Sequence, residues 1–163
     1  MLISGPAKSD ELIAGRESAV RGFFGRESDG LARACHEMAR AFAAGGTLFP
    51  FGAGTAATDA AHVAVEFMHP VIVGKRALPA LAPGNDPTAS STLARMARPG
   101  DIALGIAHRP DDPALAGFLS EARSLGLLTI ALTAAPARTE DGAAAIEADH
   151  VFTVAADDPA VVQ

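Results

Sequence analysis

Thr47-Leu-Phe-Pro-Phe-Gly-Ala-Gly-Thr-Ala-Ala-Thr-Asp-Ala-Ala-His-Val-Ala-Val-Glu-Phe-Met68 is the stretch of this chain that best predicts its fold. Residues 47–51 are an apolar run long enough for one buried strand. Gly52 and Gly54 then interrupt the pattern, and helix-compatible residues begin at about Thr55. A strand, a glycine turn and a helix N-terminus together favour an anion site, because free N–H groups and the helix dipole attract negative charge.

The predicted helix carries a narrow ionisable stripe. At the helical angle per residue, Asp59, His62 and Glu66 fall within roughly 60° of one another, and Thr55 lies on the same stripe. One interpretation is a solvated stripe with an ordinary His62–Glu66 neighbour contact. The other is a binding or catalytic site, which the glycine turn one helical turn upstream favours.

Composition limits the class of protein. The 163 residues suit one domain, spanning 1–163, with 49% hydrophobic and 20% charged residues. A formal charge of −6 without a basic cluster argues against a nucleic-acid partner. No apolar run of 18 residues predicts a membrane span, and the N-terminus lacks the pattern of a secretory signal, so the expected location is the cytoplasm. The single cysteine, Cys35, excludes an intramolecular disulfide and is expected in the core.

Two helices are predicted before the first strand. The first covers about residues 9–24, and the second begins with Asp29 as its N-cap and ends at Gly45-Gly46. Two amphipathic helices exceed what one face of a sheet needs. Residues 1–46 are therefore expected to serve helix–helix packing, including packing between subunits.

Apolar runs alternate with helical patterns in the rest of the chain. Predicted strands cover 101–107, 127–133 and 149–154, with shorter candidates at 71–75 and 78–82, and predicted helices cover 88–97 and 114–125. Pro50 cannot donate to a sheet ladder, so the first strand is expected to end at Phe49. The alternation predicts a parallel sheet covered on both faces, with ligands beyond the carboxyl ends of its strands. The Gly52 turn and the loop that begins at His108 both lie there.

The chain resembles the sugar isomerase (SIS) domain family, most closely its phosphoheptose isomerases, from about residue 10 to the end. Residues 52–66 are similar to the family pattern G-N-G-G-S, x-x-D, x-x-H, x-x-x-E. Further similarity is seen at residues 78–81, 99–102 and 105–106, and from 148 to 163. The resemblance implies an α/β three-layer αβα sandwich with a five-stranded parallel sheet in flavodoxin-like order. It also implies a homodimer or homotetramer with active sites between subunits.

The resemblance also implies a chemistry, the aldose–ketose isomerisation of sedoheptulose 7-phosphate. Glu66 matches the family's catalytic carboxylate, and His62, Glu66 and Gln163 match zinc ligands. A sugar phosphate would contact the two turns, through Gly52, Ala53, Gly54, Thr55, Asp59, His108 and Arg109. The family's second proton-transfer group is a histidine on a final helix, which is expected to be missing or truncated here.

This sequence departs from the family at both phosphate loops. Ala56 stands where the family has a serine, although Thr55 beside it offers a hydroxyl. The family's S-T-S-G-N-S loop aligns with Ala107-His-Arg-Pro-Asp-Asp112, which introduces two carboxylates that would repel a phosphate. His108 and Arg109 are the groups that could compensate.

Two functions remain open. The first is a sugar-phosphate-binding protein that resembles phosphoheptose isomerase, with Glu66 as the base. The second is a non-catalytic oligomeric module that binds another ligand or docks a protein partner. A dinucleotide-binding reading is disfavoured, because no suitable acidic residue follows the glycine turn by about 20 positions.

Overall fold

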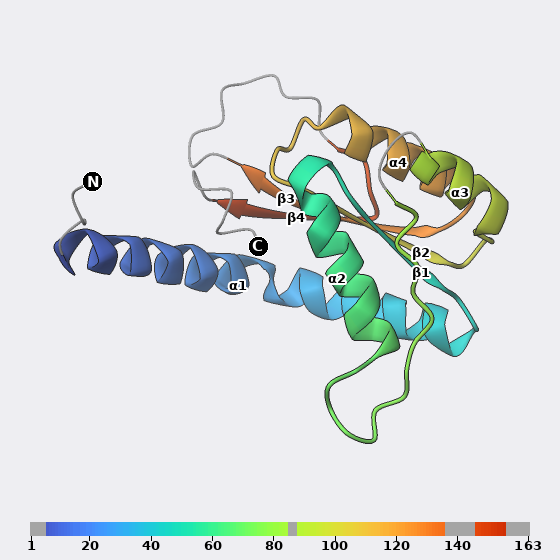
Figure 1. Cartoon of the computed structure of the whole chain (residues 1–163), viewed down its shortest axis with the longest axis horizontal. Coiled ribbons are helices and arrows are strands. Elements are labelled where there is room, and N and C mark those ends of the chain that lie inside the picture. The colour runs from blue at the N-terminus through green and yellow to red at the C-terminus, as the bar shows by residue number, and fades with distance from the viewer. Residues whose placement is uncertain (1–5, 85–87, 136–145, 156–163) are drawn as a thin grey trace.

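The computed structural model describes residues 6–84, 88–135 and 146–155 (Figure 1). A long helix precedes a sheet whose strands alternate with helices. The elements are α1 (Pro6–Ala43), β1 (Leu48–Gly52), the 3₁₀ turn η1 (Gly54–Ala56), α2 (Ala57–Met68), α3 (Thr88–Met96), β2 (Ile102–Ala107), α4 (Pro113–Ser124), β3 (Leu128–Ala135) and β4 (His150–Ala155). The predicted parallel α/β architecture is confirmed. No helix in these ranges has the length and apolarity to cross a bilayer.

The sheet has four strands in the described ranges, in the order β1-β2-β3-β4, and every pair is parallel. The prediction of five strands is therefore wrong. Residues 78–82 make only one bridge, Ala80 to Leu48, on the outer edge of β1. Residues 71–75 form bends and a turn rather than a strand, and Gly74 has a φ of 84° there.

Pro50 lies inside β1, which continues to Gly52, so the expected end of the strand at Phe49 is also wrong. Alternate N–H groups of a strand point to opposite neighbours. The N–H of Leu48 donates outward to the Pro79 carbonyl at 2.9 Å, whereas that of Ala53 donates inward to Ile106 on β2 at 3.1 Å. Pro50 shares the parity of Leu48, so its missing N–H costs the β1–β2 ladder nothing.

Helices cover both faces of the sheet (Figure 1). On one face, α3 and α4 pack over a core that includes Phe49, Phe51 and Phe118, in which the rings of Phe51 and Phe118 stack with centroids 4.6 Å apart. On the other face, α1 and α2 cover Leu48, Ile102, Ile130, Phe152 and Val154. This burial fixes which face of α2 points away from the sheet.

A single helix replaces the two predicted leading helices: α1 runs without a break over 38 residues. Glycines lower helix propensity by about 1 kcal/mol each but do not end a helix, and α1 contains no proline after its first residue. Gly30 also has a packing use, since a Cβ there would come within 3.2 Å of the Phe152 ring on β4. Cys35 is exposed, contrary to expectation, because the buried face of α1 passes through Ala34 and Met38 instead.

Candidate functional site

Gly52 and Gly54 shape the turn between β1 and α2. A Cβ on Gly52 would lie 1.9 Å from the carbonyl oxygen of Ala56, so only glycine fits where the chain folds back. Gly54 has a φ of 55°, in the left-handed region that glycine adopts most easily. These two residues place the N-terminal end of α2 at the carboxyl end of β1.

Most backbone amides of this turn are already used. Ala53 N–H donates to Ile106, Ala56 N–H donates to Ala53 at 3.1 Å, and Ala57 N–H donates to Gly54. The 3₁₀ turn η1 thus consumes donors that the sequence suggested would be free. The amides of Gly54 and Thr55 are the ones this turn leaves for a ligand.

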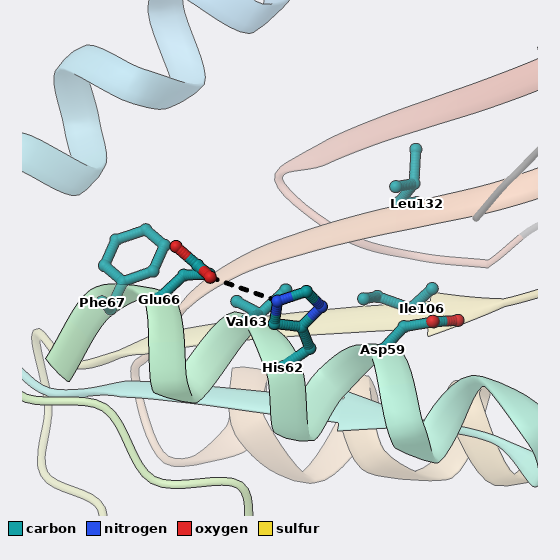
Figure 2. A pocket seen from close by; sticks show the side chains of 7 residues that line it. All are labelled: Asp59, His62, Val63, Glu66, Phe67, Ile106 and Leu132. Carbon is teal, nitrogen blue, oxygen red and sulfur yellow. Dashed lines mark hydrogen bonds and ion pairs between the residues drawn. The ribbon is translucent and has the colours of Figure 1, made fainter. Parts of the chain in front are cut away.

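The ionisable stripe of α2 faces an open hollow. Figure 2 shows Asp59, His62 and Glu66 on the same side of the helix, with apolar residues of α2 and of the sheet beside them. The hollow has a volume of about 270 Å³ and is lined by Asp59, His62, Val63, Glu66, Phe67, Ile106 and Leu132. His62 Nε2 lies 3.1 Å from Glu66 Oε1, and the two side chains are 72% and 47% exposed. The stripe is therefore both solvated and part of a concave surface.

His108 connects two strand ends. It follows β2, and its Nδ1 lies 3.2 Å from the Thr55 hydroxyl, which follows β1. Its Nε2 lies 3.9 Å from Asp59 Oδ2 on α2. The side chain of His108 is only 16% exposed, and Nε2 is buried without a hydrogen bond in the described structure. His108 thus joins the glycine turn to the first residue of the α2 stripe.

The charge of Arg109 is paired with Asp111 and not with the groups around His108. Its Nε and Nη2 donate to the two carboxylate oxygens of Asp111 at 2.9 and 2.7 Å, and the Arg109 side chain is 73% exposed. The hydrogen bond and charge of Arg109 lower the pKa of Asp111, and Asp111 in turn raises the pKa of Arg109. The second carboxylate, Asp112, caps α4, accepting from Ala114 N–H at 3.0 Å and Leu115 N–H at 3.1 Å. Both acidic side chains of this loop are therefore engaged locally.

A metal centre is not assembled by the described side chains. His62 and Glu66 are adjacent, but no group of three or more His, Cys, Asp or Glu residues in that part of the chain is placed to hold an ion. Gln163, the third expected ligand, lies outside the described residues. A tetrahedral zinc site needs three or four ligands, so these two donors are at most part of one.

Sequence reasoning missed two features of this site. Ile106 and Leu132, near the carboxyl ends of β2 and β3, line the hollow beside α2. The contact of Thr55 with His108 crosses between neighbouring strands. The sequence indicated only that these residues lie at or just after the ends of parallel strands. That position brings them to one edge of the sheet but does not specify which of them are in contact.

The family model and the sequence relatives that match this chain agree on one family. The chain matches the SIS domain family over residues 17–134. It is 32% identical over 125 residues to a phosphoheptose isomerase of Desulfovibrio desulfuricans, covering 68% of this chain and 60% of that protein. A phosphoheptose isomerase of Paramagnetospirillum magneticum is 32% identical over 136 residues, covering 75% of this chain and 67% of the relative.

Structural comparison agrees on the fold. A phosphoheptose isomerase structure from Francisella tularensis superposes with a TM-score of 0.79 at 20% identity. The match covers 98% of this chain and 91% of that one. By contrast, the sequence match spans only about 60% of the Desulfovibrio relative's length.

Proposed function

The chain belongs to the SIS domain family, and from this premise we propose that it binds a sugar phosphate at the carboxyl edge of its sheet. The observation that carries the proposal is the convergence of three groups at that edge: the Gly52 turn, the Thr55–His108 pair and the α2 stripe. The phosphate would lie at the turn, against the Thr55 hydroxyl and the Gly54 and Thr55 amides. The sugar would extend along the hollow beside Asp59, His62 and Glu66.

The proposed reaction is the aldose–ketose isomerisation expected from phosphoheptose isomerase relatives. Glu66 would remove the proton from the carbon next to the substrate carbonyl and return it to the former carbonyl carbon. A second group must carry the hydroxyl proton to the carbonyl oxygen. His62 is the described residue placed for it, because its ring is 3.1 Å from Glu66 and faces the same hollow.

Zinc would belong to this site only with help from other ligands. His62 and Glu66 supply an imidazole and a carboxylate, which are suitable donors, but the described residues supply no third. A bound zinc would polarise the substrate oxygens. Because the described set is incomplete, no step of the proposed reaction is routed through a metal.

The alternative function is a non-catalytic module that binds its ligand without turnover. The loop after β2 favours it, because Arg109 is held by Asp111 and Asp112 is held by α4. That loop then offers His108 as its one group directed to Thr55. A loop with fewer groups free for the phosphate would bind it more weakly, and weaker binding suits ligand recognition better than fast catalysis.

The proposal also includes self-association through α1. Figure 1 shows the N-terminal half of α1 extending beyond the sheet. Ile13, Val20 and Phe24, spaced by seven and four residues along it, are 61%, 46% and 57% exposed. Such a stripe is suited to pack against the same helix of a second copy.

Turnover of sedoheptulose 7-phosphate tests the proposed reaction. We expect Glu66→Gln to lower kcat at least about 100-fold while substrate still binds, because the amide cannot accept the proton. Glu11→Gln, an exposed change on α1, is the control and should leave the rate unchanged. Turnover that Glu66→Gln does not alter would remove Glu66 from the mechanism. Saturable binding without turnover in the unmodified protein would select the non-catalytic module.

A further inference from the structure

The imidazole of His108 lies between a hydroxyl and a carboxylate. Its Nδ1 is 3.2 Å from Thr55 Oγ1, and its Nε2 is 3.9 Å from Asp59 Oδ2. The ring is nearly enclosed, with its Nε2 buried, whereas Thr55 is exposed at the turn. His108 therefore reaches a ligand at this turn through the hydroxyl of Thr55.

In the neutral ring, the carboxylate decides where the single proton resides. A negative charge at 3.9 Å favours the tautomer with its proton on Nε2, facing Asp59. Nδ1 is then a bare acceptor, and the Thr55 hydroxyl donates its hydrogen to it. In this state Thr55 offers only lone pairs to a ligand, which repel the oxygens of an anion.

A second proton on the ring reverses this hydrogen bond. With both nitrogens protonated, Nδ1–H donates to Thr55 Oγ1, and the hydroxyl hydrogen is free to turn toward a ligand. The imidazolium also places a positive charge beside the turn, with Asp59 as its counterion. Both changes favour an anion at the position where the phosphate is proposed.

We propose that His108 is a positioning residue that couples anion binding at Thr55 to the uptake of one proton. This inference rests on the proposed function, since it concerns the phosphate end of the same site. The protonation state of the His108 ring then determines which ligand the site binds. A phosphate or sulfate group binds when the ring is charged, and a hydroxyl donor binds when the ring is neutral.

Apart from Asp59, the charged groups near His108 are engaged in other contacts. From α2, Asp59 faces its Nε2. From its own loop, Arg109 is closed on Asp111 by two hydrogen bonds, and Asp112 accepts from the first amides of α4. Of the charges in this loop, that of His108 is thus the one that can change when an anion binds.

Sulfate is the probe for the experiment, measured by isothermal titration calorimetry on the whole chain. A sugar phosphate loses charge near pH 6, which would obscure the effect, whereas sulfate stays a dianion between about pH 5 and pH 8. We expect sulfate affinity to fall by about tenfold per pH unit toward the upper end of this range. Titrations in buffers with different ionisation enthalpies should show uptake of about one proton per sulfate.

Substitutions separate His108 from general effects of charge. His108→Asn keeps an amide that can donate to Thr55 at the position of Nδ1, so sulfate should bind with little pH dependence and no proton uptake. His36→Asn, an exposed change on α1, is the matched control and should keep the profile of the unmodified protein.

The outcomes distinguish this inference from the proposed function. Sulfate binding without proton uptake, or with the same pH profile in His108→Asn, would overturn the coupling and leave the sugar-phosphate site standing, which sedoheptulose 7-phosphate binding tests separately. Saturable binding of neither anion at any pH tested would overturn both.

Discussion

Arg109 and Asp111 form a closed ion pair in the loop that follows β2. The two hydrogen bonds, of 2.9 and 2.7 Å, use both oxygens of the carboxylate and two nitrogens of the guanidinium. Because Arg109 lowers the pKa of Asp111, the carboxylate stays ionised below its ordinary range, and the pair holds throughout the neutral range. The loop therefore has little net attraction for an anion beyond that of His108.

Opening this pair should strengthen anion binding. In Asp111→Asn the carboxylate is gone, and the guanidinium of Arg109 is free to turn toward a phosphate or sulfate. We expect sulfate to bind about three- to tenfold more tightly at low salt, because the exposed positive charge of Arg109 is then unpaired and little screened. Calorimetric titration measures it. Unchanged or weaker affinity would show that Arg109 cannot reach the site even when released.

At the scale of elements, glycine controls how closely helices approach the sheet. Gly105 on β2 lies under α4, and a Cβ there would come within 2.1 Å of Leu115 Cδ1 and 3.4 Å of Leu119 Cδ2. Both leucines are fully buried. The position of α4, and with it the end of the loop that carries His108, depends on this close contact.

A matched pair of glycine substitutions tests this packing. Gly105→Ala should lower the free energy of unfolding by about 1–3 kcal/mol, because Leu115 must shift in a tight core. Gly117→Ala, on the open side of α4 with no atom near the added Cβ, should raise it by about 0.5–1 kcal/mol. Urea unfolding monitored by circular dichroism gives both values. Equal effects of the two changes would contradict the packing argument.

The elements with local signals were predicted well from sequence. Apolar runs marked β1, β2, β3 and β4 to within about two residues, and the helix predicted at 114–125 is α4, which begins at Pro113 with Asp112 as its cap. The capping residue and the proline act within one turn, so their effect is readable without knowing the rest of the fold.

Features that depend on non-local geometry could not be read in the same way. Whether Pro50 interrupts β1 depends on which side each N–H faces, and so on where residues 79–81 lie. The close packing of α1 on β4 at Gly30 joins residues far apart in the sequence. In the site, Asp59, His62 and Glu66 were grouped correctly by helical periodicity. The pairing of Arg109 with Asp111 could not be predicted, because it depends on the side-chain conformations in the folded loop.

At the scale of the whole molecule, α1 carries more apolar surface than one chain covers. Phe23 is buried against the sheet-side core, and its ring meets that of Phe24 edge to face, with centroids 5.3 Å apart. Phe24 itself remains 57% exposed, together with Leu12 and Ile13. Burial of such side chains contributes roughly 25 cal/mol per Å², which favours association of two helices.

Light scattering coupled to size-exclusion chromatography tests this association. We expect the unmodified chain to elute as a dimer or larger assembly, and Val20→Glu to shift it to the monomer by placing a charge in the stripe. Ala39→Glu, an exposed change elsewhere on α1, is the control and should keep the assembly intact. A monomeric unmodified protein would exclude the α1 interface.

Binding of sedoheptulose 7-phosphate by the unmodified chain and by Thr55→Val, measured by titration calorimetry near pH 6, is the most direct test of the proposed site. The account predicts saturable binding of one ligand per chain, weakened at least about tenfold in Thr55→Val through loss of one hydrogen bond to a charged group. Saturable binding of equal strength in both proteins, or none in the unmodified chain, would contradict it.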